Sequence, residues 1–94
     1  MLQTALTVHT EKAEKYQDML SKHFARKVEV TRQASQATIH FPMGICYFSV
    51  ANNTMHFLCE AQNEDALEAV KGIISGHVPL LKELKNIELN WQST

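Results

Sequence analysis

Histidine is the residue here with the widest chemical range, because imidazole binds metals, transfers protons and, when charged, binds anions. None of the chain's histidines has a His-x-x-x-His or His-Glu-x-x-His spacing, so no local metal motif exists. Two of them, on the outer face of an expected sheet, are separated by a strand and lie about 9–10 Å apart, which is far for one ion. We therefore predict no metal site and no cofactor. The five histidines are His9, His23, His40, His56 and His77, and the outer-face pair is His40 and His56.

His77 has a different setting. It lies on the apolar stripe of an expected helix, just before Pro79, which must end that helix. A buried imidazole needs a hydrogen-bond partner, and a carbonyl left without its helical partner near the break can provide one. We expect a largely buried core histidine bonded to such a carbonyl. The alternative is a ligand-contacting group at the helix break.

A basic run ends the first expected helix, with the sequence Lys22-His23-Phe24-Ala25-Arg26-Lys27. Positive charge near a helix C-terminus complements the helix dipole, and this is the simpler interpretation. The functional interpretation is a small anion site with Lys27 and His23 as donors. His23, Lys27 and His77 are thus the candidate ligand-binding residues.

Cys46 and Cys59 are a second candidate pair. A two-residue loop at Asn52-Asn53 places them opposite each other on adjacent strands, with Cα atoms about 4.5 Å apart. That separation is at the short end of the disulfide range, so a redox pair is geometrically allowed. The chain has no Cys-x-x-Cys motif, and two small residues filling the core is the simpler interpretation. We predict neighbouring, free thiols.

Three consecutive strands organise the chain, because apolar and polar residues alternate along each of them. Asn tolerates the positive φ of a two-residue hairpin loop, so Asn52-Asn53 predicts the second turn. This register pairs Phe48 with Phe57 and keeps one face apolar. The expected strands cover residues 37–41, 45–50 and 54–61.

The first turn of this meander contains Pro42, which cannot adopt positive φ. A two-residue hairpin loop is therefore not expected there. We predict a longer loop over residues 42–45, which places Phe41 opposite Cys46 and Ile39 opposite Phe48.

Two amphipathic helices and three further strands flank the meander. The order β-α-β-β-β-β-α-β predicts an α+β two-layer sandwich, a mostly antiparallel sheet with two helices on one face, as a single domain over residues 1–94. The expected strands are 2–8, 28–31 and 87–91, and the expected helices run from Thr10 to about Arg26 and from Asn63 to His77.

Composition limits the partners of the chain. It has 94 residues and a formal net charge of -1, so we expect no general affinity for nucleic acid. No apolar run approaches the length of about 18 residues that a membrane span needs. The first residues have neither the basic region nor the apolar core of a signal peptide, and we therefore expect a cytoplasmic protein.

Several short motifs together resemble the bacterial domain-of-unknown-function family 2218, from Leu6 to Trp91. That resemblance implies a context of iron uptake and a siderophore-interacting flavin reductase as a partner. Two departures count against a shared histidine-based metal site: Arg26 stands where a second histidine is common, and Pro79-Leu80-Leu81 replaces a segment that usually carries Arg and Phe. The motifs are His23-Phe24-Ala25-x-Lys27, Ile39-x-Phe41-Pro42-x-Gly44, Glu60-Ala61, His77 and Trp91.

Three functions follow as hypotheses. The first is a non-enzymatic binding or accessory module. The second is a small enzyme using His77 or His23 as acid or base, although the sequence offers no set of nucleophile, base and orienting group. The third is a homodimer through the outer sheet face, where Ile45, Tyr47 and Leu58 are unusually apolar for a solvated surface.

Overall fold

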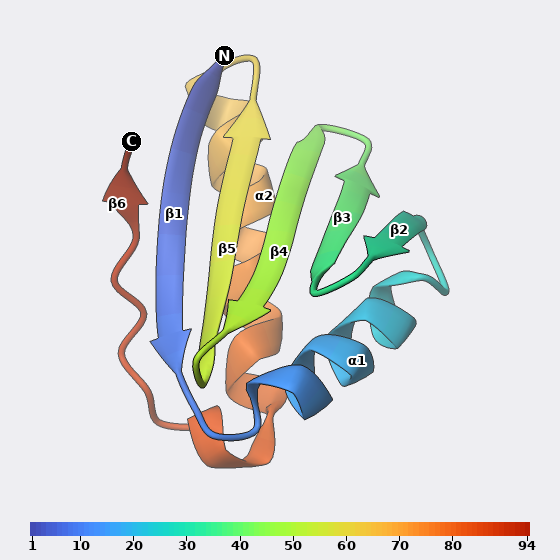
Figure 1. Ribbon diagram of the computed structural model, residues 1–94. Helices are drawn as coiled ribbons and strands as arrows, with labels where there is room; N and C mark the ends of the chain where they lie inside the picture. Colours follow the sequence, from blue (N-terminus) through green and yellow to red (C-terminus); the bar gives the residue numbers. More distant parts are fainter.

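A six-stranded antiparallel sheet carries two helices on one face in the computed structural model, which describes all residues 1–94 (Figure 1). The strand order is β2-β3-β4-β5-β1-β6, and this confirms the predicted α+β sandwich. Two short 3-10 turns, Val78–Leu80 and Lys82–Leu84, follow the second helix. The elements are β1 (Leu2–His9), α1 (Ala13–Phe24), β2 (Glu29–Gln33), β3 (Gln36–Phe41), β4 (Gly44–Ala51), β5 (Thr54–Ala61), α2 (Glu64–His77) and β6 (Gln92–Ser93).

The β4–β5 hairpin has the predicted register. Asn52 and Asn53 have φ of 51° and 58°, which is the paired left-handed geometry of a type I′ turn. Phe48 therefore stands opposite Phe57, and their rings stack with centroids 4.2 Å apart. Such an aromatic pair contributes about 0.5–1.5 kcal/mol beyond the area it buries.

The prediction of a longer loop between β3 and β4 is wrong. Phe41 pairs with Gly44, so Pro42 and Met43 alone form the connection, and neither has positive φ. Proline at the second position of a turn is compatible with types I and II, and type I needs no left-handed residue. The register moves by two residues and pairs Ile39 with Cys46, so the same side chains still point to the core.

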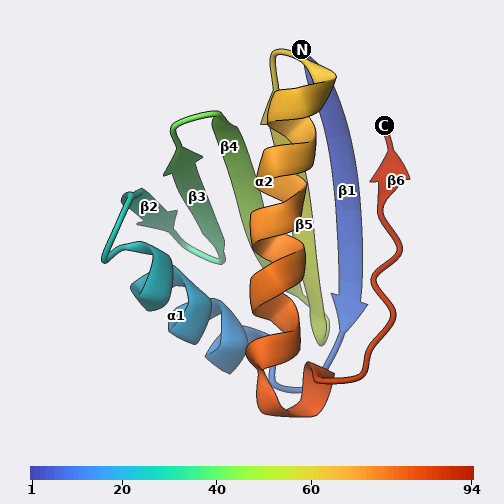
Figure 2. The same ribbon diagram turned by 180° about the vertical axis from the view of Figure 1, so that it is seen from behind.

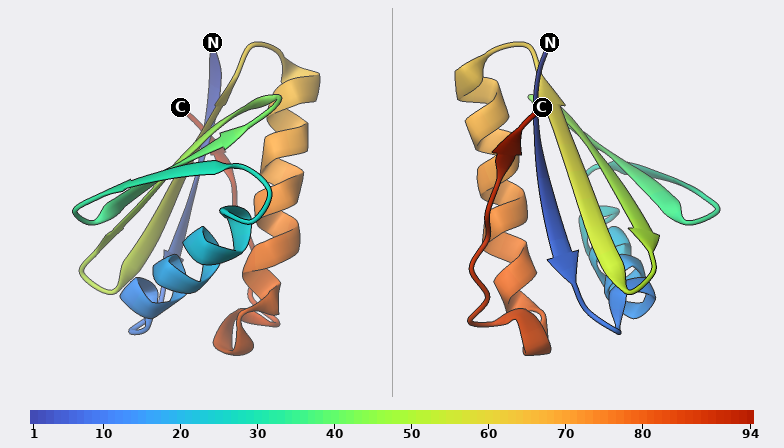
Figure 3. Two further views of the ribbon diagram at one scale, coloured as in Figure 1. Left: turned by 90° about the vertical axis from the view of Figure 1, so that its right-hand side faces the viewer. Right: turned by 60° about the vertical axis from the view of Figure 1, so that its left-hand side comes forward.

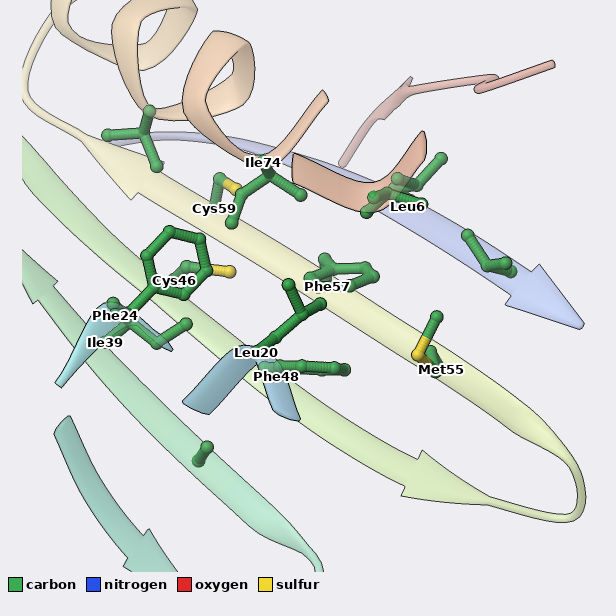
Figure 4. Packing of buried hydrophobic residues seen from close by; sticks show 14 of the residues in the cluster. Leu6, Leu20, Phe24, Ile39, Cys46, Phe48, Met55, Phe57, Cys59 and Ile74 are labelled. Atoms are coloured by element: carbon green, nitrogen blue, oxygen red, sulfur yellow. The ribbon is translucent and has the colours of Figure 1, made fainter. Parts of the chain in front are cut away.

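Both helices cover the same face of the sheet (Figure 2). α1 packs mainly on β4, with contacts to β3 and β5, and α2 packs mainly on β5, with contacts to β1 and β4. From α1, Leu20 enters the core beside Phe48 and Phe24 enters it beside Ile39, while Ile74 of α2 lies beside Cys59 of β5 (Figure 4). The predicted apolar stripe of α1 is buried as expected.

Helix α1 begins later than predicted. Thr10 does not cap it, because its hydroxyl accepts from the Lys12 N–H in a turn outside the helix, and the helix starts at Ala13. Inside the helix, Gln17 is buried and donates both amide hydrogens, to the carbonyls of Ser35 and Phe48 at 2.9 Å each. These bonds attach α1 to the β2–β3 turn and to β4.

Helix α2 has the predicted start and end. The Asn63 side chain accepts from the Ala66 N–H at 2.8 Å, and the helix ends at His77 ahead of Pro79. The helix approaches the sheet closely at Gly44. A Cβ built there would lie 2.5 Å from the Glu60 carbonyl oxygen and 3.0 Å from a methyl group of Val70 on α2.

The expected last strand over residues 87–91 is wrong. Only Gln92 and Ser93 pair with β1, whereas the preceding segment is extended without strand pairing. The Trp91 indole N–H donates to Ser75 Oγ at 2.8 Å, which ties this segment to α2. The alternation of apolar side chains therefore reflects packing on the core and α2, with Ile87, Leu89 and Trp91 half-buried.

The opposite face of the sheet carries no helix (Figure 3). Tyr47 lies there in the row formed by Thr38, Tyr47, Leu58 and Ala5 across four neighbouring strands. Ile45, Tyr47 and Leu58 are half-buried by their neighbours. Neither helix is long and apolar enough to traverse a lipid bilayer.

Candidate functional site

The first side of the site is the C-terminal end of α1. His23 lies in the last turn, and the helix ends at Phe24. The carbonyl of Phe24 accepts from the N–H groups of both Lys27 and Val28 at 3.0 Å, which turns the chain toward β2. This turn leaves the side chains of His23 and Lys27 exposed beside the buried ring of Phe24.

The second side is the C-terminal end of α2. His77 Nδ1 lies 2.7 Å from the carbonyl oxygen of Ile73, one turn earlier in the same helix. A carbonyl oxygen only accepts, so Nδ1 carries the proton and Nε2 is the nitrogen left for a ligand. The predicted imidazole–carbonyl bond is therefore present, but its acceptor differs from the one expected. Pro79 has no N–H and so frees the carbonyl of Ser75, four residues earlier, whereas the imidazole bonds to the carbonyl of Ile73.

The expectation of a largely buried His77 is wrong. The ring is half-buried and lines a surface cavity of about 220 Å³ together with His23 and Lys27. The reason is tertiary: α1 ends beside the lower half of α2, so the stripe on which His77 lies meets an opening rather than the core (Figure 3, left). The eight lining residues are His23, Phe24, Lys27, Val28, Phe41, Pro42, Ile73 and His77.

Aromatic rings surround this cavity, which we call the histidine cavity. The ring centroids of His23 and His77 are 5.0 Å apart, and those of Phe24 and His77 are 4.8 Å apart. Phe24 also meets Phe41 edge to face at 5.5 Å. The cavity thus combines an apolar wall with two imidazoles from different helices.

The ionisable side chains that line the histidine cavity are all bases. No carboxylate lines it, and Lys27 forms no ion pair. The C-terminal ends of two helices contribute about -0.5 elementary charge each, and they favour a cation beside them. Lys27 offsets that field, and any proton taken up by His23 or His77 leaves a net positive site. Of the basic run, Lys22 pairs instead with Asp18 at 3.1 Å.

The histidine cavity offers too few ligands for a metal ion. The two imidazoles supply two nitrogens, whereas zinc sites in proteins use three or four protein ligands. The structure contains no group of three or more His, Cys, Asp or Glu side chains placed to hold one ion. His40 and His56 lie on the outer face of the sheet, where His40 pairs with Ile45 and His56 with Ser49.

Cys46 and Cys59 face each other on β4 and β5, as predicted, and both thiols are free and fully buried. The hydrogen bond between the two thiols, followed by burial, raises the pKa of Cys46 well above its ordinary value of 9.0. The thiolate is the reactive species, so this environment disfavours exchange or alkylation. The pair fills the core beneath the helices.

Part of the histidine cavity was not identified as functional from the sequence. Phe24 and Phe41 belong to apolar stripes, and stripes alone indicate burial rather than a cavity wall. A larger hollow of about 460 Å³ between β1, α2 and the C-terminus has no histidine and no aromatic ring among its lining residues.

Comparison with known proteins places the chain in a family. The structure resembles the NMR structure of PA4090 from Pseudomonas aeruginosa with a TM-score of 0.77 and 25% sequence identity, over 98% of this chain and 96% of that one. Comparison with curated proteins gave no significant match. The family model described as "Uncharacterized protein conserved in bacteria (DUF2218)" matches residues 5–92. Six of the motif residues, His23, Phe24, Lys27, Phe41, Pro42 and His77, line the histidine cavity. The chain belongs to the DUF2218 family of bacterial proteins.

Proposed function

We propose that this protein is a non-enzymatic binding module that takes a small anionic ligand in the histidine cavity. The observation that carries the proposal is the convergence of His23, Lys27 and His77 on one cavity without a facing carboxylate. An unpaired cation beside an apolar wall favours a ligand that brings its own negative charge, because a charge-assisted hydrogen bond is about twice as strong as a neutral one.

The lining argues for binding rather than catalysis. It contains no Ser, Thr, Cys, Asp or Glu, so no hydroxyl, thiol or carboxylate nucleophile lines the cavity beside the imidazoles. Acid or base catalysis by His77 or His23 is the second candidate, favoured by one observation. The bond from His77 Nδ1 to Ile73 fixes the tautomer and leaves Nε2 as a base. Such a reaction requires a substrate that supplies every other group.

The biological context of the proposal comes from the resemblance to family 2218. We place the module in the handling of iron and siderophores, in the cytoplasm, with a siderophore-interacting flavin reductase as its partner. The exposed basic rim at Arg26 and Lys27 offers that partner a contact surface. Co-elution of the two purified proteins in size-exclusion chromatography tests the partnership, and separate elution at every ratio contradicts it.

Titration with acetate and inorganic phosphate, followed by ¹H–¹⁵N NMR, tests the binding function. We expect saturable shifts at the histidine cavity, and affinity reduced about five- to tenfold by Lys27→Met, which removes one charge-assisted bond. The matched control is Lys15→Met, an exposed lysine near the other end of α1, which should bind as the native protein does. Equal affinity of the two variants, or no saturable shift, rejects the proposal.

A further inference from the structure

We infer that the ligand of the histidine cavity is a single-ring aromatic carboxylate. This inference rests on the proposed function and narrows it to one chemical class. It depends on the shape of the cavity wall, the volume of the cavity and the donors available at its rim.

The wall of the cavity is built from rings at aromatic contact distance. Phe24 stands at 88° to Phe41 and at 51° to His77, and His77 stands at 54° to His23. These tilted arrangements present both edges and faces, and aromatic rings favour edge-to-face and offset contacts at centroid separations of about 4.5–7 Å. A flat ring inserted here meets partners of that kind, whereas a puckered aliphatic ring meets only their apolar surface.

The volume limits the ligand to one ring. A buried apolar cavity of about 150 Å³ holds benzene. The histidine cavity, at about 220 Å³, has room for one ring and a small substituent. Sites for drug-sized ligands have about 300–1,000 Å³, so a nucleotide or a polycyclic cofactor exceeds this space.

The donors at the rim match a carboxylate better than a phosphate. Lys27 supplies one ammonium, protonated His77 supplies one N–H beside the one bonded to Ile73, and protonated His23 supplies up to two. The cavity lining includes no helix N-terminus, whose free N–H groups commonly bind the oxygens of a phosphate. Two oxygens on a planar carboxylate can be satisfied by this set.

Four probes separate ring from charge in an NMR titration of the native protein: benzoate, cyclohexanecarboxylate, acetate and benzyl alcohol. We expect benzoate to bind at least about tenfold more tightly than acetate or benzyl alcohol, a difference of about 1.4 kcal/mol. Cyclohexanecarboxylate should bind at least about threefold more weakly than benzoate, since it lacks the aromatic contacts. The Lys27→Met substitution should weaken the binding of benzoate, and the control substitution Lys15→Met should not.

Other results contradict the aromatic class of the ligand alone, or both that class and the anion-binding function. Acetate binding as tightly as benzoate, or cyclohexanecarboxylate matching it, overturns the aromatic class and leaves an anion-binding module. Benzyl alcohol matching benzoate overturns the requirement for charge, and with it both the inference and the proposed function. The absence of saturable binding by all four probes overturns both as well.

Discussion

His23 and His77 come from the C-terminal ends of different helices, and their imidazole rings lie 5.0 Å apart between centroids at 54° to each other. This pair is the structural basis of the proposed site, because it sets two titratable groups and Lys27 around one opening. The two imidazoles and the Lys27 ammonium therefore reach a bound ligand from two sides of the same cavity.

Glycine 44 is predicted to tolerate no side chain. Gly44→Ala should lower the free energy of unfolding by about 1–3 kcal/mol, because the new Cβ meets the Glu60 carbonyl at 2.5 Å and forces β5 or α2 to move. Gly72→Ala is the matched control, since nothing lies within 4 Å of a Cβ there, and it should stabilise α2 by up to about 1 kcal/mol. Urea unfolding measures both. Equal effects of the same sign would show that the close approach at Gly44 is absent.

Substitution of two buried polar residues on α1 should change the free energy of unfolding in different directions. Ser21 Oγ is buried without a hydrogen-bond partner, so Ser21→Ala should leave stability unchanged or raise it. Gln17→Met keeps the volume but leaves the carbonyls of Ser35 and Phe48 without their donor, and it should cost about 1–3 kcal/mol. Chemical denaturation of both variants tests this. A neutral Gln17→Met would mean that the two bonds do not hold α1 to the sheet.

The buried thiols predict a loss of stability in alkali. Because the folded-state pKa of Cys46 is raised, its contribution to stability is full below the ordinary value of 9.0 and is lost as pH rises toward the folded value. The free energy of unfolding should therefore fall above about pH 9 in the native protein and less steeply in Cys46→Ala. The folded protein should also resist thiol labelling. Rapid labelling at neutral pH, or the same alkaline slope in both proteins, contradicts this account.

The homodimer through the outer sheet face remains a prediction. If Tyr47 and Leu58 pack against a second copy, light scattering should give twice the monomer mass for the native protein. Tyr47→Lys places a charge in the centre of that face and should give a monomer, whereas Ala69→Lys, exposed on α2, should not. A native protein that is monomeric at the concentrations used for NMR excludes this interface.

The sequence predicted the three strands of the meander and the β4–β5 register because the determinants are local. Asn52-Asn53 permits the left-handed turn, and alternation around Phe48 and Phe57 selects one face. The first turn was mispredicted for a local reason too, since Pro42 excludes positive φ but not a type I turn. Strand order was not predictable, because β1 pairs with β5 through contacts distant in sequence.

The candidate site was predicted only in part. His23, Lys27 and His77 were identified as candidates, yet their meeting depends on how α1 crosses the sheet, and no local pattern encodes that crossing. Periodicity assigned His77 to the core, because an apolar stripe looks the same whether it ends in the core or at an opening. Trp91 misled for a similar reason: it alternates like a strand residue, but it packs on α2 through Ser75.

The imidazole resonances provide the most direct test of the central claim, that the histidine cavity binds an aromatic carboxylate. In a benzoate titration followed by ¹H–¹³C NMR, the resonances of His23 and His77 should shift together and saturate, and Lys27→Met should weaken the binding. Lys27 is the lysine that lines the cavity, and no carboxylate lines it. The chain's other histidines, His9, His40 and His56, lie outside the cavity and should not move. Equal shifts of all five imidazoles, or no saturable shift of His23 and His77, would contradict the account.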